Sequence, residues 1–123
     1  KFELTEKLNT NIKDDNFFTY NESDLNKLDE ASIQKIVSKY NLSGYDKGLA
    51  VVFIVDNLNK STVEEVVWVT FLNISTKKVI FTEKTVAKAG GFGIRNYWAR
   101  PFYDIMKNIK SSLFKKWKSK YGA

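Results

Sequence analysis

The chain has 123 residues and a net charge of +6, with 43% hydrophobic and 15% aromatic residues but only one Pro and six Gly. This length and apolar content suit a single folded domain with a hydrophobic core, rather than a disordered chain or a membrane-spanning segment. Cys and His are both absent, which excludes disulfides, thiolate nucleophiles, Cys-based zinc or iron–sulfur sites and histidine-mediated proton transfer.

The first part of the chain predicts two helices and one short strand. Apolar residues recur at helical spacing over residues 3–12, which predicts a short amphipathic helix. Residues 17–20 are aromatic or β-branched throughout, as in a short strand. Ser23 can then cap a second helix by accepting a bond from a backbone N–H, and an apolar stripe predicts that this helix covers residues 24–40.

Three strands are predicted in the middle of the chain, at residues 49–57, 65–74 and 79–88. The segment Leu49–Val55 is apolar on both faces, which is typical of a central strand covered on both sides. The last of the three strands mixes apolar with charged residues, as in a strand that is half exposed or at an edge. Short polar connections between them predict an antiparallel meander.

A glycine-rich joint at residues 89–93 leads into a final helix, predicted at residues 97–118. Pro101 fits best in the first turn of that helix, so we expect residues 94–99 to form a separate lead-in turn or a kinked entry. Three- and four-residue steps give the helix one apolar face, which consists of Trp98, Phe102, Ile105, Ile109, Leu113 and Trp117.

Together these elements predict one α/β (α+β) domain over the whole chain. Its mixed sheet of about four strands contains the three-strand antiparallel meander and is packed by the two long helices. If the strand at 17–20 runs parallel to Leu49–Val55, the helix between them makes a right-handed crossover. We expect Trp68 and Ile105 to lie in the core, where replacement by Ala costs several kcal/mol.

The glycine-rich joint is the main candidate for a binding site. Glycines between a strand and a helix let backbone N–H groups approach an anion, and the start of the helix adds partial positive charge. No complete nucleotide-binding motif is present. The alternative is that these glycines have a structural role, because glycine allows positive φ angles and close packing of a strand against a helix. The candidate ligand-binding residues are Gly90, Gly91, Gly93, Arg95, Asn96 and Tyr97.

All of the excess positive charge lies in the last quarter of the chain. Residues 1–94 carry a net charge of −1, whereas residues 95–123 carry +7. A lysine-rich helix can contact an anionic surface or polymer, but it also complements the helix dipole and keeps a domain soluble. The sequence does not favour nucleic acid as a partner, because lysines outnumber arginines here and no nucleic-acid-binding motif accompanies them.

Two other patterns fit turns and caps better than they fit sites. Acidic pairs lie in predicted turns or on solvated faces without EF-hand spacing, so we expect no metal site; they are Asp14-Asp15, Asp29-Glu30 and Glu64-Glu65. Asn-x-Ser triplets occur where a cap or turn needs Asn; they begin at Asn21, Asn41, Asn59 and Asn73.

Two stretches carry a resemblance to known proteins, the hairpin Thr76-Lys77-Lys78-Val79 and the joint Gly90-Gly91-Phe92-Gly93-Ile94-Arg95-Asn96-Tyr97-Trp98. With the aromatic strand before them, they resemble small envelope proteins of Bacteroidetes-type bacteria over roughly residues 24–117. The order of elements is also similar to that of the amino-terminal domain of TolB and the related CsgG and LpoB proteins. The resemblance implies an assembly or scaffold domain of the bacterial envelope. The chain departs from that family in opening with only one short strand and in lacking a lipobox Cys.

We therefore expect a non-enzymatic binding or assembly module without a cofactor, located in the periplasm or cell envelope. Its partner would be a protein or an anionic envelope component, and no segment predicts a membrane span. The alternative is a small-anion or nucleotide-binding domain centred on the joint at Gly90–Asn96. A third reading is an enzyme that uses a Ser–Lys pair or two carboxylates.

Overall fold

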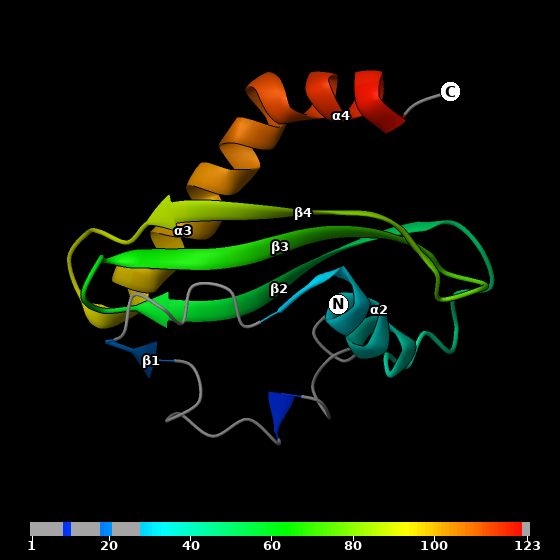
Figure 1. Cartoon of the computed structure of the whole chain (residues 1–123), viewed down its shortest axis with the longest axis horizontal. Coiled ribbons are helices and arrows are strands. Elements are labelled where there is room, and N and C mark those ends of the chain that lie inside the picture. Colours follow the sequence, from blue (N-terminus) through cyan, green and yellow to red (C-terminus); the bar gives the residue numbers. More distant parts are fainter. Residues whose placement is uncertain (1–8, 11–17, 21–27, 122–123) are drawn as a thin grey trace.

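The computed structural model describes residues 9–10, 18–20 and 28–121, and its elements form a mixed α/β fold (Figure 1). The helix predicted over residues 3–12 lies outside the described residues except at 9–10. Helices pack on both faces of one sheet, whose strands follow the order β1-β2-β3-β4. The α/β class predicted from the sequence is confirmed.

Three strands form the antiparallel meander, namely β2 (Leu49–Asn59), β3 (Glu64–Asn73) and β4 (Val79–Lys88). This meander was predicted, and β4 lies at the edge of the sheet, as its mixed composition indicated. The fourth strand, β1 (Phe18–Thr19), has only two residues and pairs in parallel with the end of β2. Of the strand expected at residues 17–20, Tyr20 lies beyond β1 and Phe17 lies outside the described residues. The hand of the crossover from β1 to β2 stays a prediction.

The sheet has a hydrophobic core on each face. Side chains of β3 point alternately to the two faces, as in any strand, and those from Glu65 to Thr70 are all buried. Trp68 and Ile105 belong one to each core, which confirms that both are core residues. The core beneath α2 (Glu30–Ser38) contains Ile33, Val37, Tyr40, Leu42, Ile54, Trp68 and Leu72. The core beneath the C-terminal helices contains Val67, Val69, Ile105 and Trp117.

The start of β2 is more open than the sequence predicted. Leu49 is 58% exposed and Val51 is 45% exposed. Both side chains point to the face of the C-terminal helices, but Phe53 is the first residue of β2 that meets them, through an edge-to-face contact with Phe102. The expectation that Leu49–Val55 is covered on both sides is therefore wrong for its first residues.

The second helix is shorter than the predicted range of 24–40, because α2 begins only at Glu30. Asp29 caps it by accepting a bond from the Ser32 N–H at 2.7 Å, and a second bond from the Ser32 hydroxyl lowers the pKa of Asp29. Just before the cap, the Leu28 N–H donates to Asp56 Oδ2 of β2 at 3.1 Å, so that the chain is tied to the sheet there. The cap of α2 is thus Asp29, and Ser23, which was predicted to cap the second helix, lies outside the described residues.

A single side chain joins α2 to the hairpin between β3 and β4. Gln34 Nε2 donates to the carbonyl of Lys77 at 3.0 Å, and Gln34 Oε1 accepts from the N–H of Val79 at 2.9 Å. These two bonds resemble the pairing that a further strand would provide. Gln34 therefore fixes the position of the helix relative to the start of β4.

Replacing Gln34 with Ala is expected to lower the free energy of unfolding by about 1–3 kcal/mol, because it removes the partners of two half-buried backbone groups. Urea unfolding measures the loss. The matched control is Lys35→Ala, which truncates an exposed side chain of the same helix. Equal losses in the two variants would show that Gln34 has no special part in the fold.

The helix predicted at residues 97–118 consists of three segments, α3 (Ile94–Asn108), the π-helix η4 (Ile109–Leu113) and α4 (Phe114–Tyr121). Figure 1 shows that the chain changes direction where α3 gives way to α4. Helix α3 begins directly after Gly93, so the expected lead-in turn at 94–99 is absent. Pro101 lies inside the helix and is fully buried. The prediction that it belongs to the first turn of the final helix is therefore wrong.

The spacing of the apolar stripe explains the π-helix. From Ile105 onward its residues follow at steps of four, to Ile109, Leu113 and Trp117. An α-helix has about 3.6 residues per turn, so that repeated steps of four drift around its axis. One wider π-turn absorbs this drift and keeps Trp117 on the face that meets the sheet.

Helix α4 is held on the sheet by aromatic and polar contacts. Trp117 is 4% exposed and lies 5.5 Å from the ring of Phe81, while Tyr121 stacks on the same ring at 4.5 Å. Glu83 accepts bonds of 2.9 Å from both Lys120 and Tyr121, and the bond from Lys120 lowers the pKa of Glu83. One side of α4 is therefore fixed to β4.

Two acidic side chains are buried in the sheet. Glu65 is only 1% exposed. The prediction that it lies in a turn or on a solvated face is therefore wrong. Glu65 lies between Leu58 and Ala87 on the sheet face that the C-terminal helices cover. Burial raises the pKa of Glu65 to about 8, and its Oε2 finds no hydrogen-bond partner among the described residues. Asp56 is 7% exposed and accepts a bond from Trp68 Nε1 at 3.1 Å.

Candidate functional site

The glycine-rich joint turns the chain from β4 back onto the sheet. Gly91 and Gly93 have φ angles of +114° and +83°, which residues with a Cβ rarely adopt. The N–H of Gly90 donates to the carbonyl of Tyr97 at 3.1 Å. That carbonyl is available because Pro101, four residues later, has no N–H to offer it. Glycines and proline thus cooperate in forming the turn, and the Gly90 N–H is not open to an anion.

The remaining candidate residues of the joint lie on the first turn of α3. Arg95 and Asn96 are exposed, whereas Tyr97 is half-buried and contacts Trp98 edge to face at 5.2 Å. No side chain caps this helix at Gly93, and its first turn contains no acidic residue. Of the residues that the sequence singled out, Arg95 and Asn96 are therefore the ones whose side chains can reach a ligand. Anion binding at the joint stays a prediction.

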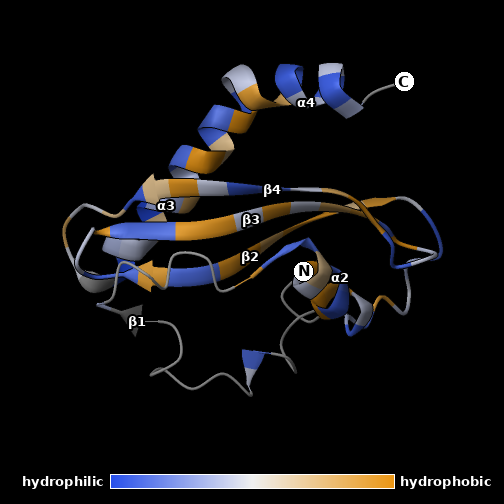
Figure 2. Ribbon diagram, in the orientation of Figure 1, coloured by the Kyte–Doolittle hydropathy of each residue, from blue (hydrophilic) through white to orange (hydrophobic). Residues whose placement is uncertain are grey.

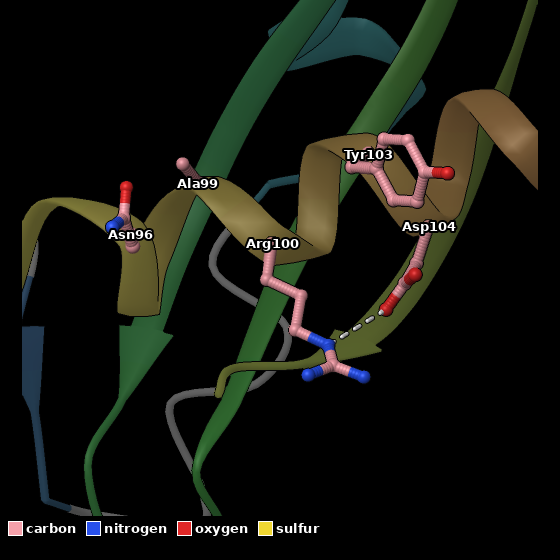
Figure 3. A pocket seen from close by; sticks show the side chains of 5 residues that line it. All are labelled: Asn96, Ala99, Arg100, Tyr103 and Asp104. Carbon is pink, nitrogen blue, oxygen red and sulfur yellow. Dashed lines mark ion pairs between the residues drawn. The ribbon is translucent and has the colours of Figure 1, made fainter. Parts of the chain in front are cut away.

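An open depression of about 380 Å³ lies beside these residues on α3 (Figure 3). Across it, Arg100 Nε lies 3.7 Å from Asp104 Oδ2, a long ion pair in which both side chains are exposed to water. Such a pair contributes little to stability, so that Arg100 can exchange it for another anion. The lining residues are Asn96, Ala99, Arg100, Tyr103 and Asp104, and Asn96 is one of the ligand-binding candidates predicted from the sequence.

Farther along, the exposed side of the C-terminal helices combines lysines with large apolar side chains. Tyr103 is 62% exposed, Met106 51% and Phe114 55%. Figure 2 shows hydrophilic residues alternating with hydrophobic ones along these helices. We define the basic face as the exposed residues Tyr103, Met106, Lys107, Lys110, Phe114, Lys115 and Lys118.

The lysines of the basic face are not neutralised by any acidic side chain among the described residues. None of the four forms an ion pair with a residue that the structure describes, whereas Arg100 pairs with Asp104 and Lys120 with Glu83. Asp104 is also the only acidic residue of the segment 95–123, whose net charge is +7. Like charges gathered on one side of a helix repel one another, and an anionic partner relieves that repulsion. The surface therefore suits an anionic ligand.

The sequence indicated the lysines of the basic face but not its apolar members. The necessary signal was present, since Tyr103, Met106 and Phe114 fall outside the regular stripe from Trp98 to Trp117. An apolar residue that is out of phase with the buried stripe must point toward solvent. The phase of these three residues relative to the buried stripe therefore predicts that their side chains are exposed.

The Asn-x-Ser triplets have local structural uses wherever the structure describes them. Asn41 Oδ1 accepts from the N–H of Ser43 at 3.1 Å, and Asn59 Oδ1 from the N–H of Ser61 at 2.9 Å. Asn73 Oδ1 accepts from the Ser75 hydroxyl at 2.7 Å. Each Asn closes a turn onto the residue two positions later, as predicted. Asn21 lies outside the described residues.

Comparison of the chain with protein families, with curated proteins and with solved structures finds no match. None of the helices in the described part of the chain is long and apolar enough to cross a bilayer. The described residues also bring together no group of three or more acidic side chains that could hold a metal ion.

Proposed function

We propose that the chain is a non-enzymatic binding module whose basic face holds an anionic component of the bacterial envelope. The observation that supports this most strongly is the presence, on one exposed side, of three large apolar side chains and four lysines that form no ion pair with a described residue. The opposite side of the same helices is fixed to the sheet through Ile105 and Trp117. A ligand would therefore meet a surface whose geometry is set before binding.

The location in the envelope is supported by the resemblance of the hairpin at Thr76–Val79 and of the joint to envelope proteins. In that compartment the basic face would meet anionic polymers and the headgroups of phospholipids. Its lysines attract either kind of ligand over a distance that shrinks as salt is added. Binding should accordingly weaken with ionic strength.

Reversing three charges on the basic face is expected to weaken binding to an anionic polymer by about 100-fold or more, because each lysine near an anionic surface contributes about 1 kcal/mol. The variant is Lys107→Glu/Lys110→Glu/Lys115→Glu, and the probe is dextran sulfate in a fluorescence or calorimetric titration.

The matched control is Lys39→Glu/Lys47→Glu/Lys78→Glu, which makes the same change in net charge with exposed lysines outside the C-terminal helices. This control should keep most of the affinity. If it loses as much affinity as the first variant, then total charge rather than the basic face governs binding, and the proposal is wrong.

A further inference from the structure

Large apolar side chains of the basic face have more than half of their surface in water. The exposed fractions of Tyr103, Met106 and Phe114 lie between 51% and 62%. Charge alone does not call for such residues, because a partner bound only by lysines gains nothing from apolar surface next to them. Their presence indicates a partner that offers both negative charge and an apolar layer.

Cationic and apolar side chains are interleaved along the helix rather than separated. Tyr103, Lys107 and Lys110 follow at steps of four and three, which places them on one side of α3 and its continuation. Met106 precedes Lys110 by four residues and is therefore its neighbour on the helix surface. A lysine can lay its hydrocarbon stem along such an apolar neighbour and extend its ammonium group outward.

We infer that the anionic component is the headgroup layer of a phospholipid bilayer. The lysines of the basic face contact lipid phosphates, while Tyr103, Met106 and Phe114 insert into the boundary between headgroups and acyl chains. The bound helices lie along the membrane surface and do not cross it. This inference rests on the proposed function and adds the chemistry of the partner.

The shape of the surface favours lipid over nucleic acid. Proteins that bind single strands stack the bases on aromatic side chains inside a basic groove. Met106 and Phe114 lie on the outer side of a helix, and neither lines the depression at Asn96–Asp104. Duplex DNA would engage the lysines but would leave these apolar side chains in water.

Co-sedimentation with vesicles tests the inference. The full chain is mixed with vesicles of phosphatidylcholine alone or of phosphatidylcholine with phosphatidylglycerol, and in parallel titrations with dextran sulfate and with single-stranded or duplex DNA. With four lysines at the surface, we expect binding to the phosphatidylglycerol vesicles to be on the order of 1,000-fold tighter than to phosphatidylcholine.

The decisive variant is Met106→Gln/Phe114→Gln, which keeps every charge. It should bind phosphatidylglycerol vesicles about tenfold more weakly than the parent and dextran sulfate equally well. The control Ile80→Thr/Val86→Thr removes apolar side chains of similar exposure, 54% each, from β4 and should leave both affinities unchanged. Far-UV circular dichroism and thermal unfolding establish that each variant is folded.

Two results would overturn the inference. In the first, Met106→Gln/Phe114→Gln binds the phosphatidylglycerol vesicles as tightly as the parent does. In the second, DNA binds more tightly than the vesicles. The proposed function survives either result if the lysine reversals still weaken binding to dextran sulfate. If the lysine reversals change neither vesicle nor dextran sulfate binding, the proposed function fails as well.

Discussion

Replacing Trp68 with Ala is expected to lower the free energy of unfolding by about 3–5 kcal/mol. Trp68 is 8% exposed in the core beneath α2, where it packs with Ile33 and Leu72. Its truncation leaves a cavity and also deprives Asp56 Oδ2 of the indole N–H that donates to it at 3.1 Å. A buried carboxylate that loses such a donor is destabilised further.

Urea unfolding followed by circular dichroism measures this loss. Trp68→Phe is the matched control, because it fills much of the cavity but cannot donate to Asp56. Its expected loss is about 1–3 kcal/mol, the cost of the missing bond. If Trp68→Ala lowered the free energy of unfolding by no more than Trp68→Phe does, then α2 would not pack on Trp68, and the described core beneath α2 would be contradicted.

Replacing Glu65 with Gln is expected to stabilise the fold near neutral pH and to remove part of its pH dependence. Burial raises the pKa of Glu65 to about 8, against an ordinary value of 4.5 that applies to the unfolded chain. Between these two values the folded protein keeps a proton that the unfolded chain has released. The free energy of unfolding therefore receives its full contribution from protonated Glu65 below pH 4.5. Above that pH, this contribution falls by about 1.4 kcal/mol per pH unit until pH 8 is reached.

Chemical unfolding of the parent and of Glu65→Gln at several pH values measures the effect. At about pH 7 we expect the variant to be more stable by about 3 kcal/mol, and below about pH 4.5 the two proteins should be nearly equal. Glu64→Gln is the control, because it removes a neighbouring carboxylate without changing the buried one. A difference between Glu65→Gln and the parent that stays constant with pH would show that Glu65 is not buried as described.

The middle of the fold could be predicted because local signals there agree with one another. Alternating and continuous apolar runs separated by polar turns predict the β2–β3–β4 meander, and the joint at residues 89–93 indicates where the chain turns back. Helix α2 was predicted too long because its cap is Asp29, and a distant group also holds the chain just before that cap. Asp56 holds the Leu28 N–H across 28 positions of sequence, and no local pattern near Ser23 reveals that bond.

Other errors come from features that depend on register. Glu65 looked like one of two adjacent solvated acids, and its burial follows only from which face of β3 it occupies. The candidate site was predicted in part: the sequence indicated the basic residues after Gly93 but not the exposure of Met106 and Phe114. The bond from Gly90 to Tyr97 was also beyond prediction, because it depends on a proline inside the helix.

The central claim is that the basic face is the surface that meets the anionic partner. Because the chain has no Cys, a single Ser111→Cys substitution within η4 can carry an environment-sensitive fluorophore, and Ser43→Cys provides an exposed control outside the C-terminal helices. On titration with dextran sulfate or phosphatidylglycerol vesicles, we predict a saturable change in emission from the label at position 111 and none from the label at position 43. A change in emission from the label at position 43, with none from the label at position 111, would contradict the claim that the basic face meets the partner.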